Sequence, residues 1–148
     1  MKKSGILHAE LSKAVARMGH GDIIVIGDIG VPFPRHEMTT CIDLAITKGV
    51  PKVTDVLKVV LEELVCEEYI VAQETKDISP DVYADFKSII DKHGNDSNEL
   101  KERVLPHIDI KDLWLNGSFK GEEVKVFVRA GDHIPYCYIA LAAGVSFS

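Results

Sequence analysis

The strongest constraint on the fold is a short apolar run with a polar turn on either side. Ile23-Ile24-Val25-Ile26 holds four consecutive β-branched residues, a pattern typical of a buried strand. Gly19-His20-Gly21-Asp22 precedes this run, and Gly27-Asp28 follows it. The sequence therefore predicts a buried strand with His20 just before its start and Asp28 just after its end.

Both polar residues occupy positions where ligands are often bound. The glycines beside His20 allow positive φ and leave room for a ligand to approach. A carboxylate at the carboxyl end of a buried strand lies where open α/β sheets bind their ligands. A surface histidine in a turn, followed later by an aspartate that caps the next turn, fits the same spacing. Both interpretations stay open from spacing alone.

Composition narrows the class of protein. The chain of 148 residues is 46% apolar and 27% charged, which fits a single globular domain over residues 1–148. Its 17 basic and 23 acidic residues give a net charge of −6, which argues against nucleic acid or an anionic membrane as a partner. Apolar runs stay short of the roughly 18 residues needed to span a bilayer. We expect a cytoplasmic protein that binds small molecules.

The thiol and histidine patterns predict no metal centre. Cys41, Cys66 and Cys137 are odd in number and widely spaced, so we expect reduced thiols and no zinc site. The six histidines also lack the short spacings that helical metal sites use.

Hydrophobic periodicity and turn signals outline the secondary structure. The helices expected cover 7–18, 54–66, 79–94 and 109–114, with Gly19 as the left-handed residue after the first. The strands expected, besides 23–26, are 69–72, 100–104, 124–128 and 139–145. Loops are predicted at 30–34 and 94–98. Such alternation predicts an α/β fold, a single domain with a mostly parallel sheet and helices on both faces.

Several motifs recur together in one known order. They are Lys2-Lys3-Ser4-Gly5-Ile6-Leu7, Met18-Gly19-His20-Gly21-Asp22, Gly27-Asp28-Ile29-Gly30-Val31-Pro32, Ile42-Asp43-Leu44-Ala45, Lys48-Gly49-Val50-Pro51, Pro135-Tyr136 and the terminal Ala-Gly-Val-Ser-Phe. Across essentially the whole chain, this set resembles the ribose and fucose mutarotase family. The resemblance implies an isomerase without cofactor that interconverts the β-pyranose and β-furanose rings of D-ribose. It also implies a ring-shaped homodecamer with sites between neighbouring subunits.

The resemblance also assigns residues. It implies that His20 is the catalytic proton donor and Asp28 the sugar-binding carboxylate. His107, in Leu105-Pro106-His107-Ile108, resembles a second histidine that contacts the substrate. Tyr136 matches the tyrosine of the family's substrate-binding Tyr-Ala-Asn triplet.

The rest of that triplet departs from the family pattern. Here it reads Tyr136-Cys137-Tyr138, so a tyrosine stands where an asparagine amide would both donate and accept hydrogen bonds. This change leaves the sugar open: L-fucose or another pentose is an alternative substrate. A sugar-binding protein without turnover is a further alternative.

The chemistry of ring exchange explains why these residue types fit. The hemiacetal must open to the aldehyde and close through another hydroxyl, so every step is a proton transfer. Histidine suits the donor role because its ordinary pKa, about 6.5, makes both protonation states accessible near neutrality. Asp28, His107 or a water molecule could act as the base, and Asp28 could also orient His20.

Overall fold

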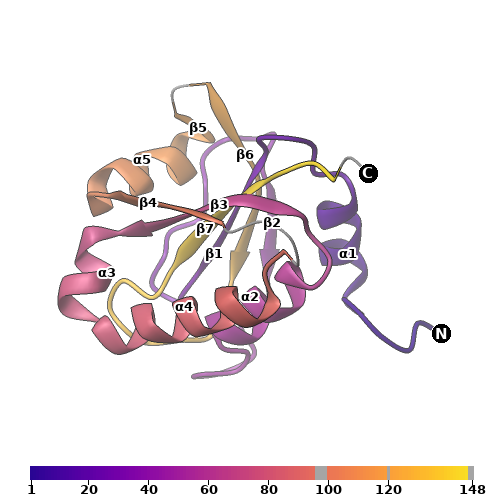
Figure 1. Cartoon of the computed structure of the whole chain (residues 1–148), viewed down its shortest axis with the longest axis horizontal. Coiled ribbons are helices and arrows are strands. Elements are labelled where there is room, and N and C mark those ends of the chain that lie inside the picture. The colour runs from indigo at the N-terminus through magenta and orange to yellow at the C-terminus, as the bar shows by residue number, and fades with distance from the viewer. Residues whose placement is uncertain (96–99, 120, 147–148) are drawn as a thin grey trace.

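The described strands join one sheet, whose members lie far apart in the sequence (Figure 1). The structure, a computed structural model, describes residues 1–95, 100–119 and 121–146. Its strands are β1 (Ile23–Gly27), β2 (Thr40–Asp43), β3 (Cys66–Ala72), β4 (Lys101–Leu105), β5 (Ser118–Phe119), β6 (Glu122–Arg129) and β7 (Ile139–Ala143). Its helices are α1 (Ala9–Ala16), α2 (Val53–Leu61), α3 (Gln73–Ile78), α4 (Pro80–His93) and α5 (His107–Asn116).

The sheet has the strand order β2-β6-β1-β7-β3-β4, with β5 paired to β6. β1 runs parallel to β6, β2 parallel to β6, and β3 parallel to β4. β7 is antiparallel to both of its neighbours, β1 and β3. The predicted mostly parallel sheet is confirmed, and β7 is its exception.

Helices cover both faces of this sheet, as the sequence predicted. On one face, α1, α2 and α4 contribute Leu11, Leu57 and Phe86 to a core that includes Ile24 and Ile26 of β1. On the other face, α5 packs Ile110, Leu113 and Trp114 against Ile23 and Val25. In Figure 1, α2 and α4 lie next to each other, and α5 lies apart from them. β1 is consequently buried at every position.

Several helix boundaries differ from the prediction. α2 ends at Leu61, and Cys66 already begins β3. Leu64 lies in the turn between α2 and β3 and is buried. Its apolar side chain continues the helical spacing of buried residues beyond the end of α2, which is why the predicted helix was too long. α1 ends at Ala16 and is followed by Arg17 in a right-handed conformation, so the expected left-handed role of Gly19 is wrong. Gly21 has the positive φ, 83°, because the turn closes through a bond from the Gly19 amide to the Asp22 carboxylate.

Three elements have no expected counterpart, and each lacks an apolar pattern. Only Ile42 of β2 is buried, because this strand lies at the sheet edge. Only Thr75 of α3 is buried, and β5 has two residues. The expected loop at 94–98 lies partly outside the described residues. Within the described ranges, no helix is long and apolar enough to cross a membrane.

The location of the core predicts that leucine-to-alanine substitutions at a buried and at an exposed position differ strongly in their effect on the free energy of unfolding. Leu57→Ala empties a fully buried position and should lower the free energy of unfolding by about 2–5 kcal/mol. Leu7→Ala alters a side chain that is 65% exposed and should change it by less than about 0.5 kcal/mol. Urea unfolding of both variants measures this, and equal effects would contradict the assignment of the core.

Candidate active site

A small cavity of about 210 Å³ opens where β1 ends, α5 begins and the chain enters β7. This is the carboxyl edge of β1 and β4, where α/β sheets bind their ligands. The cavity's ionisable and aromatic side chains come from the end of β1, from α5 and from the segment before β7. They are Asp28, His107, Lys111, Trp114, Tyr136 and Tyr138.

Asp28 is the carboxylate of this cavity, and it is only 9% exposed. The amide of Gly30 donates to its Oδ1 at 2.8 Å, and a Cβ on Gly30 would lie 3.1 Å from that oxygen. Burial raises the pKa of Asp28, the Gly30 amide opposes the rise, and the charge of Asp132 adds to it. Asp28 therefore has a carboxylate whose affinity for a proton is increased.

Asp132 holds the loop beside Asp28 to the rest of the fold. Its Oδ2 accepts from the amide of Val53 at 2.5 Å, at the start of α2. Its main-chain oxygen accepts from the amide of Ile29 at 3.0 Å. Asp132 thus ties the segment after Asp28 to the start of α2.

His107 is the first residue of α5, which begins after Pro106 and not at the expected Asp109. Its amide donates to Glu74 Oε2 at 2.8 Å, which satisfies a free N–H at the helix start. Burial lowers the pKa of His107. The charge of Glu74 opposes this shift, and the charge of Lys111 adds to it. The neutral imidazole is therefore favoured.

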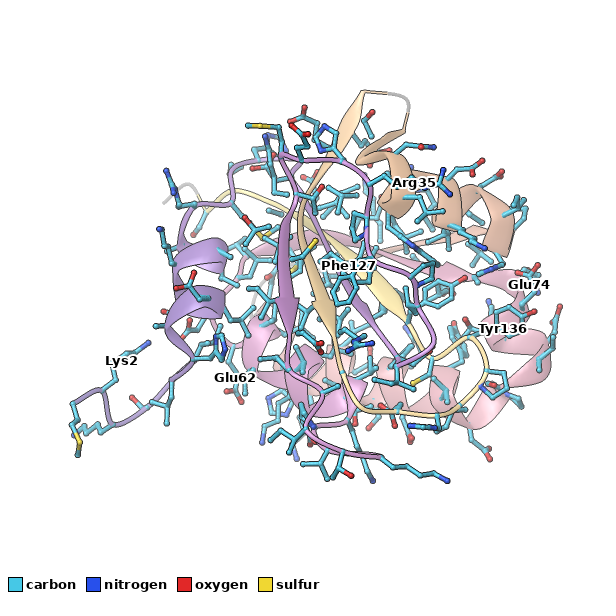
Figure 2. All side chains as sticks on the ribbon, turned by 180° about the vertical axis from the view of Figure 1, so that it is seen from behind. Lys2, Arg35, Glu62, Glu74, Phe127 and Tyr136 are labelled. Carbon is cyan, nitrogen blue, oxygen red and sulfur yellow. The ribbon has the colours of Figure 1, made fainter. Side chains whose placement is uncertain are left out.

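Tyr136 has the one positive φ outside glycine in the described chain, 55°. Its main-chain oxygen accepts from Thr75 Oγ1 at 2.8 Å, and Ser79 Oγ donates to the oxygen of Pro135 at 2.6 Å. Its ring meets His107 edge to face, with centroids 5.2 Å apart. Figure 2 shows Tyr136 and Glu74 on the same side of the molecule. Strain of this kind clusters at functional sites.

Tyr138 forms the inner wall of the cavity and is 1% exposed. Its hydroxyl lies 2.6 Å from Nδ1 of His107, and its ring packs on Trp114 with centroids 5.0 Å apart. Burial raises the pKa of the Tyr138 phenol, so it keeps its proton. Trp114 Nε1 is buried and has no hydrogen-bond partner among the described residues, which leaves one free donor at the wall.

Cys137 does not line the cavity, in contrast to its neighbours in the triplet. Its thiol is buried in the core on the opposite face of the sheet, and this burial raises the pKa of the Cys137 thiol. The prediction from the resemblance that Cys137 belongs to the sugar-binding triplet stays a prediction. Its side chain points away from this cavity, because adjacent side chains of an extended segment point to opposite faces.

His20 lies away from this cavity, at the other end of β1. Four steps of about 3.3 Å separate the first and last residues of that strand, so roughly 13 Å lie between its two ends. Nε2 of His20 is 3.0 Å from Oε2 of Glu67 on β3, and both side chains are about half exposed, at 58% and 49%. Within one chain, Asp28 therefore cannot orient His20.

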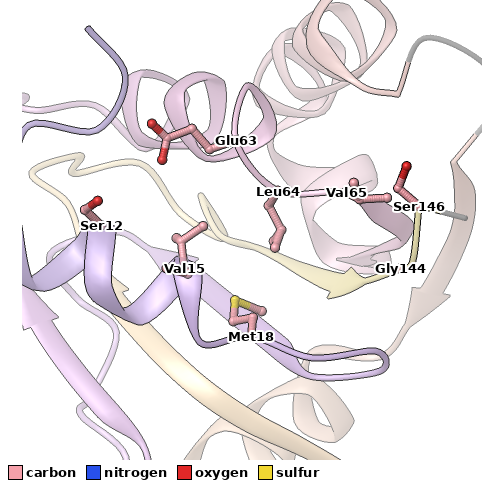
Figure 3. A pocket seen from close by; sticks show the side chains of 9 residues that line it. Ser12, Val15, Met18, Glu63, Leu64, Val65, Gly144 and Ser146 are labelled. Atoms are coloured by element: carbon pink, nitrogen blue, oxygen red, sulfur yellow. The ribbon is translucent and has the colours of Figure 1, made fainter. Parts of the chain in front are cut away.

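A larger hollow of about 470 Å³ lies near the N-terminal end of β1 (Figure 3). Val15 and Met18 lie across it from Leu64. Glu63 is the one ionisable residue among its described lining residues, and its carboxylate already accepts from the amide of Ile6 at 2.8 Å. Acid and base chemistry therefore fits the smaller cavity better.

Sequence analysis missed Lys111, Trp114 and Glu74 at the site. Lys111 follows His107 by four residues, so the two share one face of α5. A correct helix start at His107 would have indicated it. In the described ranges, no group of three or more histidines, cysteines or carboxylates is placed to hold a metal ion.

The raised pKa of Asp28 predicts a gain in stability when its charge is removed. Above its ordinary value of 3.8, the unfolded chain ionises Asp28 more readily than the folded one, so folded-state stability falls as pH rises. Asp28→Asn should therefore raise the free energy of unfolding at pH 7, and this gain should vanish below about pH 3.8.

Asp43→Asn is the matched control, measured by urea unfolding from pH 3 to 8. Arg129 lowers the pKa of Asp43, so this variant should lose stability at pH 7. If Asp28→Asn also lowered the free energy of unfolding at pH 7, the claim that the buried charge of Asp28 destabilises the folded protein would be contradicted.

Comparison with known proteins agrees with the resemblance seen in the motifs. The model of the RbsD / FucU transport protein family matches residues 1–146. D-ribose pyranases from Pseudomonas putida and Geobacillus thermodenitrificans are 40% and 38% identical, over 99% and 100% of this chain and all of each relative. The structure of Bacillus subtilis RbsD complexed with D-ribose has a TM-score of 0.83 at 32% identity, over 99% of this chain and 100% of that one. The chain therefore belongs to the RbsD / FucU transport protein family.

Proposed function

We propose that this protein is a D-ribose pyranase, an isomerase that interconverts β-D-ribopyranose and β-D-ribofuranose. The observation that carries the proposal is the cavity with Asp28, His107 and Tyr136, in a chain similar over its full length to D-ribose pyranases. Its volume of about 210 Å³ suits a monosaccharide. A ligand with many hydroxyls would use its several donors and acceptors.

Ring opening needs one proton donor and one acceptor. His20 protonates the ring oxygen as its bond to the anomeric carbon breaks, and a base takes the proton of the anomeric hydroxyl, whose oxygen becomes the aldehyde oxygen. For closure, a different hydroxyl attacks the aldehyde carbon and gives its proton to His20, while the base returns its proton to the aldehyde oxygen. Both groups end in their starting states, so the reaction consumes no cofactor.

Two subunits must supply the groups for this reaction. His20 and Asp28 lie at opposite ends of β1, which supports a site in which a neighbouring chain supplies the histidine. His20 is more than half exposed, which leaves it free to reach such a neighbour. The exposed apolar side chains of Met38 and Ile46, on either side of the edge strand β2, offer surface for assembly. We propose a homo-oligomer, and the family resemblance suggests ten subunits in a ring.

Tyr138 supports a second candidate, a mutarotase for another sugar such as L-fucose. This large side chain fills space at the cavity wall where the family triplet has an asparagine. A protein that binds sugar without turnover is the remaining alternative. Exchange NMR with D-ribose and with L-fucose separates these: saturation transfer without faster ring exchange would identify the binding protein.

A cytoplasmic location is part of the proposal. The thiols of Cys41, Cys66 and Cys137 are all free, which fits a reducing compartment. The proposed partners are the monosaccharide and other copies of this chain.

The proposed role of His20 predicts a large loss of rate. His20→Ala should slow the exchange between pyranose and furanose rings of D-ribose by about 10²–10⁴-fold, because the proton donor is lost. NMR exchange spectroscopy measures this rate, and light scattering checks that the variant assembles.

His133→Ala is the control, since His133 is an exposed histidine that does not line the cavity. It should exchange ribose rings at the wild-type rate. An assembled His20→Ala variant with normal exchange would rule out His20 as the donor.

A further inference from the structure

The hydrogen bond between Tyr138 and His107 is a short polar contact of the cavity wall. Oη of Tyr138 lies 2.6 Å from Nδ1 of His107. The contact is partly buried and lies among aromatic rings, with Tyr138 against Trp114 and His107 against Tyr136. A short hydrogen bond in such surroundings fixes the imidazole ring and also the position of its proton.

Which of the two groups donates in this hydrogen bond follows from the need of the Tyr138 phenol proton for an acceptor. Burial keeps Tyr138 protonated, and its hydroxyl has no other hydrogen-bond partner among the described residues. If Nδ1 carried the imidazole proton, the phenol proton would lack a partner in a buried site, which costs free energy. The phenol therefore donates to Nδ1, and the proton of the neutral imidazole resides on Nε2.

We propose that Tyr138 is a positioning residue that fixes His107 as a hydrogen-bond donor through Nε2, and that Asp28 is the base of the ring-opening step. This inference rests on the proposed function. A His107 whose Nδ1 accepts from Tyr138 and whose Nε2 is already protonated has no free acceptor for a proton of the sugar. It can instead donate to a sugar oxygen.

Among the side chains of the cavity, Asp28 is the carboxylate that can accept this proton. Lys111 is a cation that only donates, and the indole of Trp114 only donates as well. Asp28 is the one carboxylate among the described lining residues, and the surroundings increase its affinity for a proton. Asp28 takes the proton of the anomeric hydroxyl while the ring C–O bond breaks and His20 of a neighbouring subunit protonates the ring oxygen.

The position of the imidazole proton can be measured directly, without substrate. Nitrogen-15 NMR of the histidine side chains, with His107 assigned by comparison with His107→Gln, should show a protonated Nε2 and an unprotonated Nδ1 near neutral pH. In Tyr138→Phe, the two tautomers should mix. The pKa of His107 should also rise, because a bond that favours the neutral ring is lost, while Glu74 and Lys111 remain beside it.

Kinetics test the consequence for turnover. Tyr138→Phe should lower kcat/KM for ring exchange by about threefold to tenfold, the loss expected for one hydrogen bond. Tyr83→Phe is the matched control, because it removes a tyrosine hydroxyl bonded to Glu102 away from the cavity. Asp28→Asn should lower kcat far more than His107→Gln, which keeps a donor at that position.

Two outcomes would overturn the inference: a protonated Nδ1 in the wild-type protein, or unchanged nitrogen shifts of His107 in Tyr138→Phe. A greater loss of kcat in His107→Gln than in Asp28→Asn would overturn the assignment of the base. The expected nitrogen shifts without any exchange of ribose rings would instead contradict the proposed function, and the role of Tyr138 would stand.

Discussion

The burial of β1 on both faces is the constraint on which the rest of the structure depends. Two helical layers pack on its alternate side chains, so this strand sits at the centre of the sheet and cannot shift. Its two ends are therefore fixed on opposite edges of the molecule. His20 precedes one end and Asp28 follows the other, so the proposed reaction calls for His20 and Asp28 from different chains.

The cavity at the Asp28 end is organised as one connected network. α3 supplies Glu74 to the start of α5 and Thr75 to the strained Tyr136, so a short polar helix positions two site residues. His107 then links the two tyrosines, through its ring to Tyr136 and through Nδ1 to Tyr138. Tyr138 stands where the resemblance leads us to expect an asparagine, and in our proposal it positions the imidazole of His107.

Sequence reasoning predicted the parts of this structure that hydrophobic periodicity dictates. It identified β1, the long helix α4 and the two polar positions flanking β1, because buried side chains impose a regular spacing there. It missed α3 and β2, which each bury a single residue, and it began α5 two residues late. Periodicity carries no information about the bond between Tyr138 and His107, because that contact depends on tertiary packing.

Subunit complementation tests the central claim, a site shared between chains, most directly. His20→Ala and Asp28→Asn should each be nearly inactive alone, and they should regain ring exchange after dissociation and reassembly as a mixture. A random equal mixture should reach about a quarter of the wild-type rate, because one site in four then combines an intact Asp28 with a neighbour's intact His20. No recovery in fully mixed oligomers would place both residues in the same chain's site and contradict this account.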